Sequence, residues 1–542
     1  MESPRPKTLE LGVFLIIAAL PLAFLPFTLS PFADVKLVVL MGGTLAVWLG
    51  APPGERRLLQ AATAWVVVTL LAAIVGVDRG ISLTASQSGE SSGFLIVLAS
   101  AVLLIGGPGI DAALLERARR WLVWVCVIVA VFGIAFRLDP GLFVHVVAND
   151  ASIGATLGNQ LFAATFLAAG IAAALGGARV SPRDLGLAAV VALGIASFGE
   201  RSSLLLPPLM CGVMIWRIRP SIRTAVLICV AVLGPLALWQ AAEPLLPSNG
   251  AQGAVSQFGA SETDSQRFLV WGVLAGAALD RPILGWGPGT TQSVYLHAAT
   301  TGDVARTTRL WADGHDLFLE TLVSSGLLGL LSLLTVVVVV VPRALRSPPE
   351  RAWALATAIA LAAYALFEPV GIVLTPLLFL FAGIATGPGR EAARPIRRAW
   401  RWAAGGVMVV GIAVSGLMLT ASTLQRWGDD QGEAWAYRTA LDLAPWRVSA
   451  AEALALRLVS DSHSADPSVA EPAAAEARSV IDDAVAGHPW DPNVRLTAIQ
   501  VQVFLREYPA ALDWAEQQAA RFPSEAFRVA DMRKLAAGRA GS

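Results

Sequence analysis

A histidine precedes one of the longest apolar segments of this sequence: Asp313-Gly314-His315-Asp316 leads into an apolar run that continues to about residue 341. An imidazole titrates near neutral pH, so His315 is a candidate base for removing a proton from a substrate. Asp316 and Glu320 lie at the same helix start, where we expect them either to orient the ring or to compete with it. A capping or hydrogen-bonding role, without catalysis, is the alternative for a lone histidine at a helix start.

Two further candidates lie on the segment before this histidine. Ser261-Glu262-Thr263-Asp264 is typical of a capping box, and it predicts an amphipathic helix that continues to about Ala278. Arg267 and Trp271 are four residues apart and therefore share a face of that helix, where they could bind a charged, sugar-bearing ligand by ion pairing and ring stacking. The alternative is interfacial anchoring, because Trp and Arg are favoured at bilayer surfaces.

The connection between these two segments, Arg281 to Gly289, contains Pro282 and glycines at 285, 287 and 289. Such glycines indicate places where the backbone bends or approaches another group closely. The run lacks the lysine and the preceding strand of a phosphate-binding loop, so it does not predict a nucleotide site. A further arginine, Arg201, follows Glu200 at a helix junction, where it is either part of an anion site or neutralised by its neighbour.

The composition indicates what surrounds these residues. Of 542 residues, 55% are hydrophobic and only 15% are charged, whereas roughly a quarter of residues are charged in soluble proteins. The 40 basic and 40 acidic residues balance, so net charge gives no reason to expect a nucleic-acid partner. The three cysteines lie inside apolar runs and predict neither a disulfide framework nor a metal site.

The hydrophobic runs predict an all-α protein: a polytopic membrane bundle of about 12 or 13 transmembrane helices, followed by an α-helical repeat tail. The expected spans are 9–29, 35–50, 61–77, 92–107, 119–136, 158–176, 184–198, 202–216, 222–241, 314–341, 351–367, 369–386 and 402–421.

Basic residues are concentrated in alternate connections between these spans. They are Arg5 and Lys7; Arg56 and Arg57; Arg117, Arg119 and Arg120; Arg179 and Arg183; Arg217, Arg219 and Arg223; Arg343, Arg346 and Arg351; and Arg390, Arg394, Arg397, Arg398 and Arg401. The positive-inside rule therefore places the N-terminus in the cytoplasm. The large loop 242–313 and the C-terminal tail are then expected on the outer side.

The tail differs in composition from the rest of the chain. We expect a membrane domain over residues 1–423 and an extracytoplasmic helical domain over 424–542. Tyr437, Ala440 and Pro445 have the spacing of the second helix of a tetratricopeptide repeat, and Ile481, Ala484 and Pro489 repeat it. Pro489 and Pro523 are 34 residues apart, which is the period of that repeat. A generic Ala-rich helical bundle is the alternative.

Three blocks carry a resemblance to a known family. They are Thr156-Leu157-Gly158-Asn159-Gln160; Arg201-Ser202-Ser203; and Arg267 with Trp271, Arg281-Pro282, Gly285-x-Gly287 and His315. In this order, over roughly residues 9–421, the chain resembles the O-antigen ligase and O-antigen polymerase superfamily of bacterial membrane glycosyltransferases. It departs from the family pattern at Gln160, Glu200 and Asp316, where that pattern usually has Pro, Ser and Asn.

The resemblance implies a GT-C-like transferase that needs neither a metal nor a cofactor. It would move a glycan from an undecaprenyl-pyrophosphate carrier to an acceptor hydroxyl, with inversion, at the outer face of the cytoplasmic membrane. His315 would be the base, and Arg201 and Arg267 would bind the donor pyrophosphate. The residues expected to support them are Trp271, Arg281, Asp316, Glu320 and Asn159.

The partners implied by the resemblance are the lipid-linked oligosaccharide donor, a glycan, lipid or protein acceptor, and membrane lipids. A protein partner on the tail is a further expectation. Two other function classes remain open from the residues alone: a secondary transporter, and a membrane-anchored scaffold for polysaccharide export. The apolar runs carry few ionisable groups at mid-membrane depth, which argues against transport.

Overall fold

The structure is a computed structural model of the chain. It describes residues 5–51, 55–84, 93–139, 154–177, 179–200, 202–245, 262–307, 311, 313–368, 371–387, 398–526, 529–531 and 533–534. Within these ranges every regular element is a helix, so the all-α prediction is confirmed.

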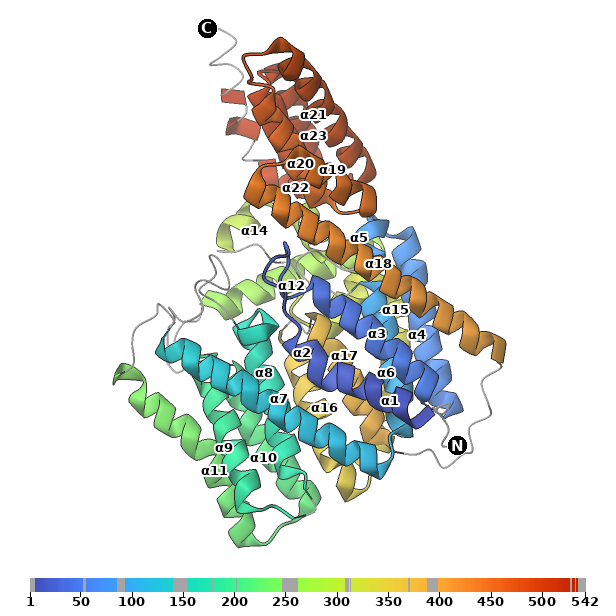
Figure 1. Ribbon diagram of the computed structural model, residues 1–542, viewed down its shortest axis with the longest axis vertical. Coiled ribbons are helices and arrows are strands. Elements are labelled where there is room, and N and C mark those ends of the chain that lie inside the picture. The colour runs from blue at the N-terminus through green and yellow to red at the C-terminus, as the bar shows by residue number, and fades with distance from the viewer. Residues whose placement is uncertain are drawn as a thin grey trace.

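Hydrophobic runs form a helix bundle that has two groups of helices side by side (Figure 1). The first group comprises α1 (Arg5–Phe14), continued by η1 (Leu15–Ala19) and α2 (Leu20–Leu22), with α3 (Asp34–Gly50), α4 (Arg56–Val75), α6 (Phe94–Gly106), α15 (Leu317–Leu345), α16 (Ala352–Ala365) and α17 (Gly371–Thr386). The second group comprises α7 (Ala112–Leu138), α8 (Gln160–Leu175), α9 (Pro182–Ser197), α10 (Leu206–Ile218) and α11 (Ile222–Ala242).

Each expected span coincides with a helix of the bundle or with α18 (Arg398–Gln431), although the first helix ends at Leu22 rather than near residue 29. Among the described residues, five helices are long and apolar enough to cross a membrane: α4, α7, α11 with its continuation to Leu245, α15 and α18. The other apolar helices are shorter, as the sequence indicated. The chain is therefore a multi-pass membrane protein.

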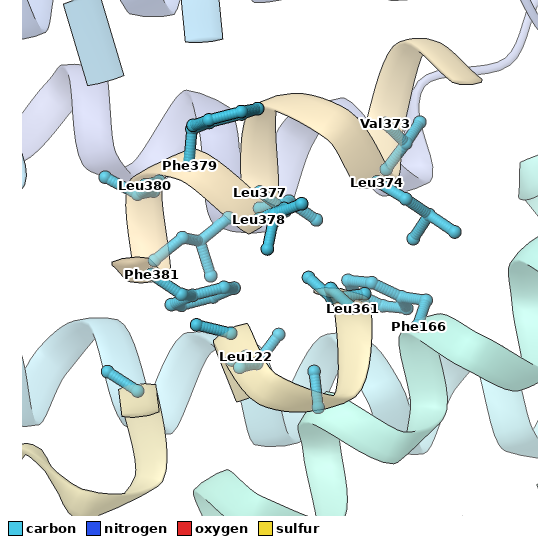
Figure 2. Packing of buried hydrophobic residues seen from close by; sticks show 14 of the residues in the cluster. Leu122, Phe166, Leu361, Val373, Leu374, Leu377, Leu378, Phe379, Leu380 and Phe381 are labelled. Atoms are coloured by element: carbon cyan, nitrogen blue, oxygen red, sulfur yellow. The ribbon is translucent and has the colours of Figure 1, made fainter. Parts of the chain in front are cut away.

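The core of the bundle forms where α8 packs against α16 and α16 packs against α17. Figure 2 shows Phe166 of α8 beside Leu361 of α16, with Leu374 and Leu377 of α17 across from them. All four side chains are buried. This contact joins the two helix groups by apolar packing alone.

Several arginines at one end of the bundle bind the carboxyl ends of helices. Arg351 donates to the carbonyls of Ile384 (2.7 Å) and Ile110 (2.8 Å). Arg401 donates to the carbonyls of Leu49 (3.0 Å) and Ala51 (3.0 Å) at the end of α3. Carbonyls at a helix end lack partners in their own helix and carry partial negative charge, so these arginines stabilise the bundle.

The large loop contains three helices: α12 (Glu262–Asp280), α13 (Thr291–Ala298) and α14 (Thr301–Arg306). The first begins at Glu262, where the sequence pattern predicted a helix start. The short helix α5 (Arg79–Thr84) lies in another connection. The contacts of α12 and α13 with α15 place the loop at the amino end of that helix.

The tail is a stack of helices that begins within α18 and continues through α19 (Ala434–Leu443), α20 (Val448–Asp461), α21 (Pro467–Gly487), α22 (Pro492–Phe504) and α23 (Tyr508–Arg521). Pro445, Pro489 and Pro523 each follow the end of one of these helices by two residues. The assignment to tetratricopeptide repeats stays a prediction. The stack covers the end of the bundle that carries α12 and α14 (Figure 1).

Candidate functional site

His315 lies just before α15 in a strained backbone conformation. Its φ is +48°, a left-handed value that a non-glycine residue rarely adopts without support. The support comes from Asp313, whose Oδ1 accepts the backbone N–H of His315 at 2.8 Å and also contacts its Nδ1. The indole ring of Trp311 lies against the imidazole, with 4.6 Å between ring centroids.

The Asp313 carboxylate determines which nitrogen of His315 is available. A carboxylate next to Nδ1 favours the tautomer that carries its proton there, which leaves Nε2 as the basic atom. Among the residues that the structure describes, no hydrogen bond occupies Nε2. The Asp313 side chain is 5% exposed, and its Oδ2 has no hydrogen-bond partner in the described structure. The pair can accept a proton at Nε2 and stabilise the imidazolium that forms.

Asp316 and Glu320 contact other groups. Asp316 is the N-cap of α15 and accepts the N–H of Leu319 at 2.7 Å. Glu320 accepts the N–H of Gly314 at 2.9 Å with one oxygen and the hydroxyl of Thr291 at 2.6 Å with the other. Asp316 therefore begins the helix, and Glu320 holds the residue next to His315.

Arg267 and Trp271 share a face of α12, as their spacing predicted. Arg267 forms an ion pair with Glu368, which lies in the connection between α16 and α17 and is only 4% exposed. The indole N–H of Trp271 donates to the carbonyl of Gly314 at 2.8 Å. Because Gly314 adjoins His315, Trp271 links the arginine-bearing helix to the histidine segment.

Tyr364, near the end of α16, interacts electrostatically with Glu368, Glu200 and Asp313. The contact that joins the Arg267 helix to the histidine segment is that of Trp271 with Gly314. Glu200 belongs to the junction where the sequence suggested an anion site. Arg201 itself lies outside the described residues. In the described part of the chain, no group of three or more His, Cys, Asp or Glu side chains is placed to hold a metal ion.

The glycine-containing turn after α12 fits into a break in α15. Gly326 has φ +65° and ψ −167°, which interrupts the helix. The turn supplies partners for the backbone groups that the break exposes: Trp286 N–H donates to the Val323 carbonyl at 2.9 Å, and Leu327 N–H donates to the Pro282 carbonyl at 2.7 Å. The break thus separates a short segment that carries the site from the long apolar part of α15.

Two glycines make this close approach possible. A Cβ at Gly326 would lie 2.3 Å from the carbonyl oxygen of Ile283, and a Cβ at Gly285 would lie 2.5 Å from that of Val323. Both residues also have positive φ. The turn is therefore a backbone support, in agreement with the prediction of bending or close approach. Arg281, from the same turn, lies over the indole ring of Trp286, 4.6 Å from its centroid.

Asn159 is the N-cap of α8, where its side chain accepts the N–H of Leu161 at 2.8 Å. The preceding turn is held by the buried Lys36, whose ammonium group donates to the Thr156 carbonyl at 2.6 Å. The Thr156–Gln160 block thus contributes local structure at the amino end of α8.

An apolar cavity of about 430 Å³ extends along α15, between this helix, α16 and α17. Leu317 and Phe318 line it next to the histidine segment, and Leu345 lines it at the other end of α15. Leu345 and Leu366 are also exposed on the outside of the bundle. The cavity is therefore a hydrocarbon-lined space that begins beside the site and reaches the surface that faces lipid.

The sequence analysis did not single out Asp313 or Glu368. For Asp313 the available signal was an acidic residue two positions before a candidate base. For Glu368 it was an isolated acid between two apolar runs, where a charge requires a partner. Neither signal identifies the partner. Glu368 pairs with Arg267 on another segment, and Asp313 contacts a histidine that has an unusual backbone angle.

The comparison with protein families gives one match: residues 164–334 fit the family model described as O-antigen ligase. The matched segment contains α12, the glycine turn, Asp313, His315 and most of α15, whereas Glu368 and the tail lie beyond it. No curated protein matches the chain. The family resemblance seen in the sequence is thus confirmed by a match over residues 164–334, where this membrane protein is similar to the O-antigen ligase family.

Proposed function

We propose that the protein transfers a glycan from an undecaprenyl-pyrophosphate-linked donor to an acceptor hydroxyl, at the outer face of the cytoplasmic membrane. The observation that carries this proposal is the pair of His315 and Asp313, which the Arg267 helix contacts through Trp271 and which precedes Leu317 and Phe318 in the wall of an apolar cavity. The family match supports a glycosyltransferase of the O-antigen ligase and polymerase type.

His315 is the proposed general base. A hydroxyl group loses its proton far above neutral pH, so attack on the anomeric carbon is accelerated by a positioned base, typically by a factor of about 10²–10⁴. The proton moves from the acceptor hydroxyl to Nε2, and Asp313 stabilises the resulting imidazolium. A single displacement of this kind inverts the configuration at the anomeric carbon.

Arg267 is the proposed site for the leaving pyrophosphate. Its guanidinium is permanently charged and can bind phosphate oxygens through two parallel hydrogen bonds, which stabilises the leaving group without a divalent cation. In the described structure it is paired with Glu368, so the pyrophosphate would compete with a carboxylate for the same donors. We extend this role to Arg201 from the sequence, on the basis of the family resemblance.

The apolar cavity along α15 is the proposed place for part of the carrier's hydrocarbon chain. Its wall begins at Leu317 and Phe318, directly after the histidine segment, and ends at Leu345. A prenyl chain in this position would place its pyrophosphate at the amino end of α15. Burying the chain there removes its apolar surface from water. The same cavity would not accommodate a polar transport substrate, because burying polar groups without partners costs free energy.

The proposed orientation puts the arginine-rich end of the bundle in the cytoplasm and the tail outside. The positive-inside rule supports this choice, because most basic residues of the connections lie on one side of the expected spans. The site and the tail then lie where lipid-linked glycans are used. The acceptor is either a second glycan, a lipid or a protein, in lipopolysaccharide or other surface-polysaccharide assembly.

The test uses the purified full chain in lipid, with an undecaprenyl-pyrophosphate oligosaccharide and a panel of acceptors. Release of the carrier pyrophosphate and formation of the glycosylated product are measured together. We expect His315→Ala and Arg267→Ala each to lower the rate by about 10²-fold or more. His463→Ala and Arg438→Ala are matched controls on the exposed tail and should act as wild type.

Normal rates in both site variants would refute the assignment of these residues. Absence of transfer by the wild type with every donor, together with uptake of a substrate into vesicles, would refute the transferase proposal in favour of transport. Loss of activity with a chelator, restored by a divalent cation, would refute the metal-independent mechanism.

A further inference from the structure

The tail contacts the loop helix α13 through hydrogen bonds and aromatic rings. Ser524 donates to the carbonyl of Leu296, and the carbonyl of Arg521 contacts Nδ1 of His297. The centroid of the Trp490 ring lies 4.9 Å from that of the His297 imidazole and 5.3 Å from that of the Trp286 ring. These contacts fix the carboxyl end of α13 against the tail.

Apolar packing reinforces this junction. The fully buried Phe522 of the tail belongs to the same cluster as Tyr295 of α13, Leu274 of α12 and Val323 of α15. A ring buried in this way contributes about 1.5–3 kcal/mol of transfer free energy. The tail is thus part of the hydrophobic core beneath the loop and is not attached by α18 alone.

The tail is also joined to the bundle at a second place. Arg447, in the connection between α19 and α20, forms an ion pair with Asp34 at the start of α3, with 3.1 Å between Nη1 and Oδ1. Both side chains are nearly inaccessible to solvent, at 2% and 6% exposure. A buried pair of this kind is strongly disrupted when one partner leaves, so the tail is held in one position.

The amino end of α13 contacts the histidine segment. The buried hydroxyl of Thr291 donates to Glu320 at 2.6 Å, and the other oxygen of Glu320 accepts the N–H of Gly314 at 2.9 Å. Gly314 lies between Asp313 and His315, the pair that performs the proposed proton transfer. One carboxylate therefore joins α13 to the backbone that carries the base.

The backbone of His315 needs this kind of support. A non-glycine residue at φ +48° stores strain and keeps that conformation only where surrounding contacts determine it. Trp271 holds the carbonyl of Gly314, and Glu320 holds its N–H. Loss of either contact would allow the segment to relax, and displacement of the base by about 1 Å can lower a rate by about a hundredfold.

We propose that the tail is a positioning element of the transfer reaction, acting through Thr291 and Glu320. The docked tail fixes α13, α13 holds Thr291 against Glu320, and Glu320 holds the segment that carries Asp313 and His315. This inference rests on the proposed function, because it assigns the tail a role in that reaction. The competing explanation is a tail that serves only to recruit a protein partner.

The experiment measures kcat and the donor KM separately for the full chain in lipid. Thr291→Val removes the hydroxyl and keeps the shape, whereas Thr291→Ser keeps the hydroxyl. We expect Thr291→Val to lower kcat about tenfold to a hundredfold with little change in donor KM, and Thr291→Ser to retain near-normal kcat. Trp490→Ala, on the tail side of the junction, should lower kcat in the same way.

Arg438→Ala is the matched control within the tail, because its exposed ion pair is with Glu476 of the same domain. It should retain the wild-type kcat. Wild-type kcat in both Thr291→Val and Trp490→Ala would overturn the inference while leaving the proposed function intact. Equal losses in Thr291→Val and Thr291→Ser would also overturn it. A wild type without any transfer would instead overturn the proposed function.

Discussion

In the part of the chain that the structure describes, two histidine–aspartate pairs lie on the tail side, and they differ in whether the second ring nitrogen of the histidine has a hydrogen-bond partner. In one, Asp78 contacts Nδ1 of His488 at 2.7 Å, and the carbonyl of Pro445 also hydrogen-bonds to the ring. In the other, Asp313 contacts Nδ1 of His315, and no hydrogen bond occupies Nε2 among the described residues. Both ring nitrogens of the first pair have partners at the junction of tail and bundle, whereas the second pair leaves the nitrogen that we propose as the base without one in the described structure.

The backbone shows the same difference. His488 and Asp78 are 410 residues apart and meet through tertiary packing, in ordinary backbone conformations. His315 and Asp313 are two residues apart and meet because His315 adopts a left-handed φ. Burial and a carboxylate partner therefore do not distinguish the two histidines. The unoccupied nitrogen and the strained backbone do, and they are the features that support His315 as the proposed base.

The largest effect that separates the two pairs is expected on turnover. Asp313→Asn should lower kcat by about 10²–10⁴-fold, because an amide next to Nδ1 no longer stabilises the imidazolium or selects the tautomer. Asp78→Asn changes the same atoms in the tail-docking pair and should lower kcat far less, because Phe522 and Arg447 still hold the tail. Steady-state transfer rates of the two variants provide the measurement. Similar rates for both would remove the distinction.

The second effect is on stability. His488→Ala should lower the free energy of unfolding by about 1–3 kcal/mol, since the Asp78 carboxylate, only 4% exposed, would lose its partner. His315→Ala should change stability less, because Asp313 Oδ1 would keep the backbone N–H of residue 315, whereas Asp78 Oδ2 would lose its hydrogen-bond partner in His488→Ala. Thermal unfolding of the two variants in the same lipid or detergent tests this. A larger loss for His315→Ala would contradict the structural assignment.

A smaller effect concerns the acid that neutralises Arg267. Glu368→Gln keeps the shape of the side chain and removes its charge, so the guanidinium becomes more available to the donor pyrophosphate. We expect the donor KM to fall about threefold to tenfold, with thermal stability reduced by about 1 kcal/mol. The measurement is transfer rate against donor concentration. An increase in the donor KM would mean that Glu368 orients Arg267 for binding and does not compete with the donor.

The smallest effect is a pH dependence of tail docking. Burial lowers the pKa of His488, but the hydrogen bond and negative charge of Asp78 raise it more, so the pKa lies above its ordinary value of 6.5. A raised pKa stabilises the folded state fully below pH 6.5, and this contribution is lost as pH rises through the folded pKa. Wild type should unfold at a lower temperature at pH 8 than at pH 6. His488→Gln should reduce that difference, and an unchanged difference would contradict the assignment.

Much of the fold follows from local sequence. Long apolar runs predicted the helices of the bundle, because a backbone in lipid must satisfy its hydrogen bonds within a helix. The capping pattern predicted the start of α12, and the four-residue spacing placed Arg267 and Trp271 on one face. All of these inferences depend on neighbours within a few residues.

The candidate site was only partly predictable. Its base and one arginine carry recognisable chemistry, but their partners depend on the tertiary structure. Glu368 meets Arg267 across 101 residues, and Glu320 meets Thr291 across 29. Asp313 is close in sequence, yet it reaches the ring only through the unusual φ of His315. The docking of the tail onto α13 has no local signal.

The central claim is that His315 acts in the chemical step and not in donor binding. The most direct measurement is a single turnover of His315→Ala with bound lipid-linked donor and saturating acceptor. The account predicts that the variant binds the donor with wild-type affinity, while release of undecaprenyl pyrophosphate is slowed by about 10²-fold or more. Release at the wild-type rate would contradict it.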